Sequence, residues 1–272
     1  MEKRTRRDVV KVGSTGLVAS VAGCTSRDPE DIGRQNGSRA NTTDGNSPER
    51  TASADGDHPE QAEFSTEELS QAKTLGEGVR EAVAVIRGDT GSGGTAWFLD
   101  TGDLITNSHV VDGNESFEAW SVDGEKFTPE LVGTSDYMNN PYHDVAVLET
   151  DFSPNNELSL GESDSVEKGQ PVVQVGHPFG IGNWVVSIGR YVEEDHGDAL
   201  LTSVPSLSGN SGAPLLTLDG SVVGITTGGV PRDRLGSETP EPVDLEVYEE
   251  FTDYKWATHD KTSVISRYVE QF

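Results

Sequence analysis

Basic residues are scarce in this 272-residue sequence, which has 20 lysines and arginines against 47 aspartates and glutamates. Its formal net charge is -27. After residue 11, lysine occurs only at Lys73, Lys126, Lys168, Lys255 and Lys261. The lack of basic clusters argues against nucleic-acid binding, because phosphate contacts require Lys and Arg patches. An acidic surface with few lysines favours a halophilic protein, since high salt screens dense like charge.

Cysteine is almost absent as well. Cys24 is the only one, so no disulfide can form within the chain. The sequence also has no HExxH motif and no Cys/His cluster, and we therefore predict no metal and no cofactor. The apolar run at residues 12–23 is too short and too rich in Gly and Ser to span a bilayer as a stable helix.

Residues 1–24 have the charged start and short apolar middle of a signal peptide. Arg6 and Arg7, followed by apolar residues and Lys11, resemble a twin-arginine export signal. Residues 21–24, Val-Ala-Gly-Cys, resemble a lipobox, in which the cysteine is lipidated and becomes the mature N-terminus. This order of features predicts an exported protein that a lipid anchors to the outer face of the cell membrane. An uncleaved anchor with a stray cysteine is the alternative.

A composition boundary lies near residue 63. Residues 25–63 are rich in Gly, Ser, Asn and Asp and show no hydrophobic periodicity, so we predict a disordered acidic linker. A single domain is expected over residues 64–272. Its first element is a predicted short helix within residues 64–80, because Ser65 and Glu68 have the spacing of a capping box.

Short apolar runs separated by Gly, Asp and Asn turns dominate the sequence from Ala82 onward. Many short strands of this kind predict an all-β sandwich or barrel, and the lack of βαβ alternation argues against a parallel sheet. Residues 262–271 form the only convincing helix after the first strand. The predicted strands are residues 82–86, 95–99, 104–106, 145–148, 171–175, 184–188, 200–203, 213–216, 221–225 and 254–257.

Residues 209–212, Gly-Asn-Ser-Gly, carry the sharpest chemical signal. A serine between glycines can occupy a tight turn with its hydroxyl exposed. The backbone N–H groups of Gly209 and Ser211 could then form an oxyanion hole for acyl transfer. Taken alone, the same motif could be an ordinary polar loop.

A nucleophilic serine needs a base and an orienting carboxylate. His109 follows an apolar strand in a small polar cluster and could accept the proton of Ser211. In isolation it would be interpreted as a structural histidine. Asp144 precedes the apolar run at residues 145–148 and is the first candidate for the carboxylate, while Asp136 is the weaker one.

Together, these motifs resemble the chymotrypsin-like serine proteases, and most closely their HtrA branch. The resemblance covers roughly residues 79–272. It implies two antiparallel six-stranded β-barrels, at about 79–160 and 161–260, and a C-terminal helix at 262–271. The matching segments are 93–96 (Gly-Gly-Thr-Ala), 106–111 (Thr-Asn-Ser-His-Val-Val), 144–148 (Asp-Val-Ala-Val-Leu), 176–180 (Gly-His-Pro-Phe-Gly) and 209–215 (Gly-Asn-Ser-Gly-Ala-Pro-Leu).

The resemblance implies a serine endopeptidase with His109, Asp144 and Ser211 as its triad. Its partners would be polypeptide substrates, unfolded proteins in particular, in extracytoplasmic quality control. Oligomerisation is left open. The implied S1 pocket is lined by Pro205, Ser206, Thr226, Thr227 and Gly228. It has no aspartate at its base, and Thr226 replaces the histidine of glutamyl endopeptidases, so we expect small or medium aliphatic P1 residues.

Several positions depart from the family pattern. Ala213 replaces the second glycine after the serine, and an acidic stretch at residues 232–253 interrupts the end of the domain. Too few residues follow Ile225 for the PDZ domain common in HtrA proteases. Asn210 replaces the aspartate that pairs with a newly cut N-terminus in trypsin, so we predict activity without such a cut.

Two other protein classes share part of this pattern. An α/β-hydrolase would have a helix after its serine and a histidine downstream, but a strand, an Asp-Gly turn and a second strand follow Ser211, and only His259 lies downstream. A catalytically weak HtrA-like chaperone or binding protein remains the alternative, although all three triad positions are filled.

Overall fold

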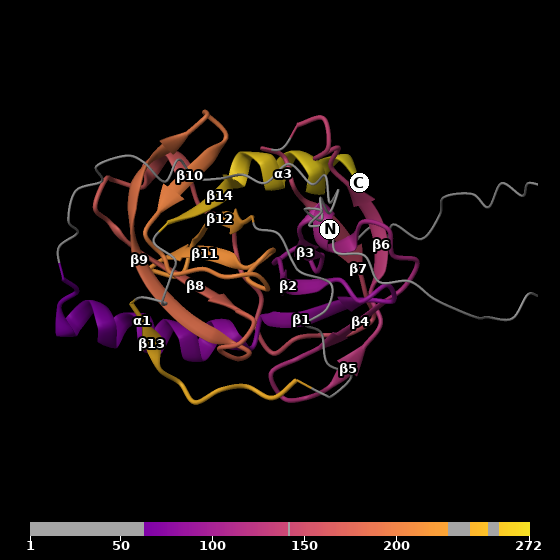
Figure 1. Ribbon diagram of the computed structural model, residues 1–272, viewed down its shortest axis with the longest axis horizontal. Coiled ribbons are helices and arrows are strands. Elements are labelled where there is room, and N and C mark those ends of the chain that lie inside the picture. The colour runs from indigo at the N-terminus through magenta and orange to yellow at the C-terminus, as the bar shows by residue number, and fades with distance from the viewer. Residues whose placement is uncertain (1–62, 141, 228–239, 250–255) are drawn as a thin grey trace, which may run out of the picture. The chain divides into compact units, whose positions relative to one another are not determined.

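Two β-sheets and three α-helices make up the part of the chain that the computed structural model describes (Figure 1). That part comprises residues 63–272 without residue 141 and the segments 228–239 and 250–255. The predictions for the signal, the linker, Cys24 and Gly228 lie outside the described residues. None of the described helices is long and apolar enough to cross a membrane.

The first sheet has seven strands in the order β5-β4-β1-β2-β3-β7-β6, all paired antiparallel. Within the described residues no pairing joins the edge strands β5 and β6, so this sheet is open, like half of a barrel. Its strands are β1 (Val83–Gly88), β2 (Gly93–Phe98), β3 (Leu104–Thr106), β4 (Phe117–Trp120), β5 (Lys126–Phe127), β6 (Glu130–Thr134) and β7 (Ala146–Glu149).

The second sheet closes on itself. Its order is β10-β14-β12-β11-β8-β9-β13, and an additional pairing of β9 with β10 completes a six-stranded barrel. The short strand β13 extends β9 in parallel outside this ring. The strands are β8 (Pro171–Gly176), β9 (Val185–Asp195), β10 (Ala199–Thr202), β11 (Pro214–Thr217), β12 (Val222–Thr226), β13 (Val247–Tyr248) and β14 (Ala257–Lys261).

One hydrophobic core joins the two sheets. Trp97 of the first sheet and Trp184, which precedes β9, are both fully buried within the same cluster of apolar side chains. Helix α1 (Thr66–Arg80) runs along β8 and β9 and adds apolar side chains to this core (Figure 1). Helix α3 (Thr262–Gln271) packs on β12 and β14 and reaches β7 of the first sheet. This shared core fixes the two sheets against each other.

The predicted all-β fold with a C-terminal helix is confirmed, and so is the second six-stranded barrel. In place of the first predicted barrel the structure has an open sheet, because no pairing joins β5 and β6 among the described residues. Ser65 and Glu68 form the predicted capping box at the start of α1. The last strand was placed wrongly, because β14 begins at Ala257 rather than ending there, and residues 254 and 255 lie outside the described part. The sequence prediction missed the strands β4, β5, β6 and β13 and the short helix α2 (Ser108–Val111).

Candidate active site

His109 lies on α2, a single helical turn that follows β3 directly. Val110 and Val111 are 1% and 2% exposed and anchor this turn in the core of the first sheet. Ser108 and Asn107 fix it further, since the hydroxyl of Ser108 donates to the Val145 carbonyl (2.8 Å) and the Asn107 amide donates to the Asp144 carbonyl (2.6 Å). The local sequence therefore places His109 next to the start of β7.

His109 and Asp144 are in direct contact. Nδ1 of His109 lies 2.5 Å from Oδ2 of Asp144, and the backbone N–H of His109 donates to Oδ1 at 3.0 Å. The side chains are only 14% and 8% exposed. A proton on Nδ1 that is shared with the carboxylate leaves the lone pair on Nε2, which is the tautomer required of a general base.

Asp136, the weaker candidate for the carboxylate, lies elsewhere. Its side chain is exposed and accepts a hydrogen bond from Asn139 at 2.7 Å. Of the two candidate carboxylates, it is therefore Asp144 that contacts His109.

A buried carboxylate from the second sheet holds the backbone of Asp144. Oδ2 of Asp260, a fully buried residue of β14, accepts the N–H of Asp144 at 2.7 Å. Sequence reasoning missed Asp260, because a single aspartate in a strand gives no signal of the residue it contacts. This bond fastens the carboxylate side of the site to the second sheet.

The serine turn is fastened to the first sheet. Thr95 of β2 donates its N–H to the Ser211 carbonyl (2.8 Å) and its hydroxyl to the Gly209 carbonyl (2.9 Å). Thr106, three residues before His109, donates its hydroxyl to the Thr95 carbonyl (2.7 Å). The structure thus brings together the segments 93–96, 106–111 and 209–215, which the sequence had singled out separately.

Glycine is required where these segments meet. A Cβ on Gly212 would collide with the Thr95 carbonyl and the Thr106 hydroxyl, and its φ of 86° is in the left-handed region. A Cβ on Gly94 would approach the Ser211 carbonyl to 2.7 Å. The close approach of β2 to the serine turn depends on both glycines.

The residues before Ser211 form a turn that presents a backbone donor. The N–H of Asn210 closes the turn on the Leu207 carbonyl (3.0 Å), and Gly209 has a φ of 99°. The Ser208 carbonyl accepts the N–H of Phe179 at 2.8 Å. Because carbonyl and N–H of a trans peptide point in opposite directions, this bond turns the N–H of Gly209 away from Phe179.

The described residues predicted for the S1 pocket are uncharged and mostly buried. Pro205, Ser206 and Thr226 are buried. The Thr226 hydroxyl is bound by Gln174 and lies 2.9 Å from Nδ1 of His259. Burial lowers the pKa of His259 to about 3, so this histidine is neutral. The Thr227 hydroxyl contacts the Thr258 carbonyl at 3.2 Å.

Tyr137 is a neighbour of the site that the sequence analysis missed. Its ring stands edge-on to the His109 ring, with 6.2 Å between their centroids. Its hydroxyl donates to Asp112 at 3.3 Å, and burial together with Asp112 raises the pKa of Tyr137 to about 12. The phenol is therefore neutral and shields one side of His109.

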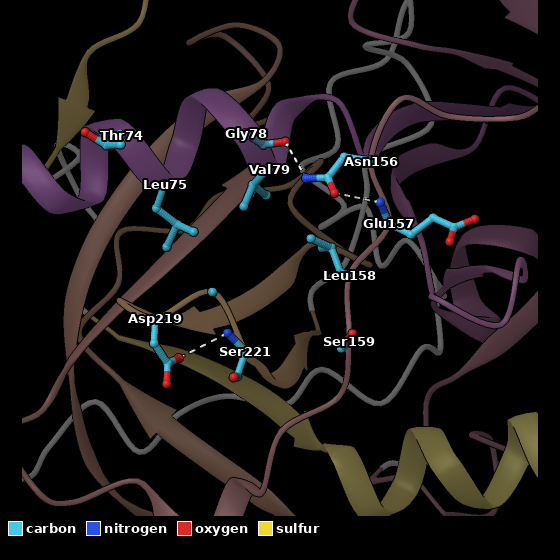
Figure 2. Close-up of a pocket in the computed structure, with 11 residues that line it drawn as sticks. Thr74, Leu75, Gly78, Val79, Asn156, Glu157, Leu158, Ser159, Asp219 and Ser221 are labelled. Carbon is cyan, nitrogen blue, oxygen red and sulfur yellow. Dashed lines mark hydrogen bonds between the residues drawn. The ribbon is translucent and has the colours of Figure 1, made fainter.

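A hollow of about 420 Å³ lies away from these residues, between α1 and the turn at residues 219–221 (Figure 2). The Asn156 amide spans its rim and donates to the Gly78 carbonyl at 3.0 Å. None of the predicted site residues lines it. Among the residues described, no group of three or more His, Cys, Asp or Glu side chains is arranged to hold a metal ion.

Comparison with known proteins connects this geometry to a family. The family model of the trypsin-like peptidase domain matches residues 94–225. A probable periplasmic serine endoprotease, DegP-like, from Halomonas elongata is 37% identical over 134 residues, which cover 47% of this chain and 27% of the relative. The match thus spans about a quarter of that relative's length.

Solved structures support the fold. A mutant of Rv3671c from M. tuberculosis, in an inactive form, aligns with a TM-score of 0.58 and 20% identity over 78% of this chain and 95% of its own. The HtrA-type protease AlgW with a tripeptide aligns with a TM-score of 0.56 and 23% identity over 75% of this chain and 62% of its own. Residues 94–225 therefore match the trypsin-like peptidase family, and about half of the chain is similar in sequence to a DegP-like serine endoprotease.

Proposed function

We propose that the protein is a serine endopeptidase in which Ser211 is the nucleophile, His109 the general base and acid, and Asp144 the orienting carboxylate. One observation carries the proposal: the 2.5 Å contact of His109 with Asp144 lies next to a serine turn that is bound to the same sheet through Thr95. A structural histidine would not need this combination.

The reaction follows from these roles. Oγ of Ser211 attacks the scissile carbonyl carbon while its proton moves to Nε2 of His109. The π electrons of the carbonyl move to its oxygen, which accepts hydrogen bonds from the backbone N–H groups of Gly209 and Ser211. Collapse of this intermediate breaks the C–N bond, and His109 returns the proton to the leaving amine. Water then repeats the sequence on the acyl-enzyme, and Asp144 stabilises the imidazolium both times.

Polypeptides are the proposed substrates, and unfolded proteins in extracytoplasmic quality control the proposed physiological class. The support is the family match, the periplasmic DegP-like relative and the tripeptide in the AlgW structure. The uncharged side chains of Ser206 and Thr226 support a preference for small or medium aliphatic P1 residues.

The matched variant Ser211→Ala tests the activity. We expect the full chain to degrade unfolded casein in high salt and the variant to be about a million-fold slower, because the triad acts as a unit. A wild-type protein that stays folded in that salt, binds casein and does not cleave it would instead favour the chaperone function.

Export through the twin-arginine route and lipid anchoring at Cys24 complete the proposal. The support is the sequence order of Arg6, Arg7 and the lipobox, together with the periplasmic relative. We expect Cys24→Ser to release the protein from the membrane fraction and replacement of both arginines by lysine to stop export. A Cys24→Ser protein that remains as firmly membrane-bound as before contradicts the anchor.

A further inference from the structure

The segment at residues 177–184, between β8 and β9, backs the turn that carries Gly209. A Cβ on Gly209 would collide with the His177 carbonyl and would touch the Phe179 ring. The N–H of Phe179 holds the Ser208 carbonyl at 2.8 Å. The direction of the Ser208–Gly209 peptide therefore depends on where this segment lies.

Trp184, the last residue of the segment, contacts His177, the first. Its backbone N–H donates to Nδ1 of His177 at 3.0 Å, and the two rings pack edge to face with 4.8 Å between their centroids. Burial lowers the pKa of His177 to about 3, so the ring is neutral and Nδ1 can accept. Trp184 has a φ of 53°, a left-handed conformation that a bulky residue keeps only where its surroundings hold it.

Arg80, the last residue of α1, supplies one of the contacts that hold Trp184. Its Nε donates to the Trp184 carbonyl at 2.7 Å, while Nη2 lies 3.5 Å from the Asp244 carbonyl. The Trp184 indole N–H donates to the Val83 carbonyl at 2.8 Å. A charged donor in this partly buried place makes a stronger bond than a neutral one.

Capping and packing contacts hold helix α1, which ends at Arg80. The capping box of Ser65 and Glu68 fixes its start. Ala72 and Val79 are buried, and Gly76 packs so closely on Val186 of β9 that a Cβ would collide with it. The helix that places the guanidinium beside Trp184 is therefore itself packed on β8 and β9 of the second sheet.

The side chain of Asn210 contributes packing but no hydrogen bond to the serine turn within the described residues. It is 1% exposed, and within the described residues neither its Oδ1 nor its Nδ2 makes a hydrogen bond. Asn210 is also neutral, so it cannot form the ion pair with a cut N-terminus that the corresponding aspartate forms in trypsin. Thr95 holds the Gly209 and Ser211 carbonyls, and the contact that sets the direction of the Ser208–Gly209 peptide is the hydrogen bond from Phe179.

We propose that Arg80 is a positioning residue for the oxyanion hole. By holding the Trp184 carbonyl it keeps the segment 177–184 in place, and through Phe179 it keeps the Gly209 N–H turned toward the reacting carbonyl. Helix α1, which lies outside the matched residues 94–225, thereby takes the place of a cut N-terminus. This inference rests on the proposed peptidase activity.

The test compares Arg80→Met, which removes the donors but keeps an unbranched apolar chain, with Arg80→Lys, which keeps the charge. The matched control is Arg190→Met, because Arg190 also binds α1, through Glu68 at 3.2 Å, but at the opposite end of the helix. For each full-length variant, kcat and KM on a quenched peptide, the rate of labelling by a fluorophosphonate, and the thermal midpoint are measured.

We expect Arg80→Met to lower kcat about tenfold or more with KM nearly unchanged, since loss of a whole oxyanion donor costs about a hundredfold or more. Labelling should slow by a similar factor, because the phosphonyl oxygen uses the same donors. Arg80→Lys should recover part of the rate, and Arg190→Met should keep the wild-type kcat.

A folded Arg80→Met with wild-type kcat and labelling rate overturns the inference, and so does an equal loss of kcat in Arg190→Met. Should Arg80→Met fail to fold, Arg80→Gln is judged by the same criteria. A folded wild-type protein that neither cleaves peptides nor reacts with the probe refutes the proposed function instead.

Discussion

Two buried histidines, His177 and His259, make the stability of the fold depend on pH. Both are fully enclosed, and burial lowers the pKa of each from an ordinary value of 6.5 to about 3. His177 accepts the N–H of Trp184, and His259 lies between Thr226 and Thr202. Both rings must therefore be neutral in the folded protein.

Proton linkage gives the direction in which the unfolding free energy changes with pH. Between pH 6.5 and pH 3 the unfolded chain binds a proton at each of these histidines that the folded chain does not, so acid favours unfolding. Their contribution is fully present above pH 6.5 and is lost as the pH falls toward 3. For each ring, a fall from pH 7 to pH 5 should lower the free energy of unfolding by about 2 kcal/mol.

Denaturant unfolding of His259→Gln at both pH values measures this. The loss of unfolding free energy between pH 7 and pH 5 should be about 2 kcal/mol smaller than in the wild type. His196→Gln is the control for the substitution itself, because the His196 side chain is 64% exposed. An undiminished acid loss in His259→Gln would mean that the buried ring does not titrate as stated.

Some of the residues of the candidate site could be predicted from the sequence, and others could not. His109, Asp144 and Ser211 could be singled out because each lies in a short motif whose neighbours are small or apolar. Asp260 and Arg80 could not, because their roles come from contacts with residues that are 116 and 104 positions away.

At the scale of elements, the sequence predicted the strands with dense apolar runs and missed those without them. Strand β6 is exposed along most of its length, and β5 and β13 have only two residues each. Helix α2 has four residues, too few for any periodicity, and exists because buried neighbours hold Ser108 and Asn107. Such elements are set by the packing around them.

Helix α1 shows the converse case. Its capping box was visible in the sequence and the helix formed as predicted, yet nothing in the sequence connected its last residue to the site. The prediction that no cut near the start of the domain is needed gains a physical basis from Arg80, since an intact helix makes the contact.

At the scale of the whole molecule, the proposed site is assembled where the two sheets meet. His109 and Asp144 come from the first sheet, Ser211 and its turn from the second, and contacts of Thr95 and Asp260 cross between them. The shared core around Trp97 and Trp184 keeps the halves together. Partial loosening of either sheet should therefore disable the chemistry before the protein unfolds.

The central claim is that Ser211 is an activated nucleophile. The most direct measurement is labelling of the full chain in high salt with a fluorophosphonate, followed by mass spectrometry of the modified peptide. The account predicts one adduct per chain, at Ser211, and none in Ser211→Ala or His109→Ala. A folded wild-type protein that stays unlabelled, or that carries the adduct on another residue, would contradict it.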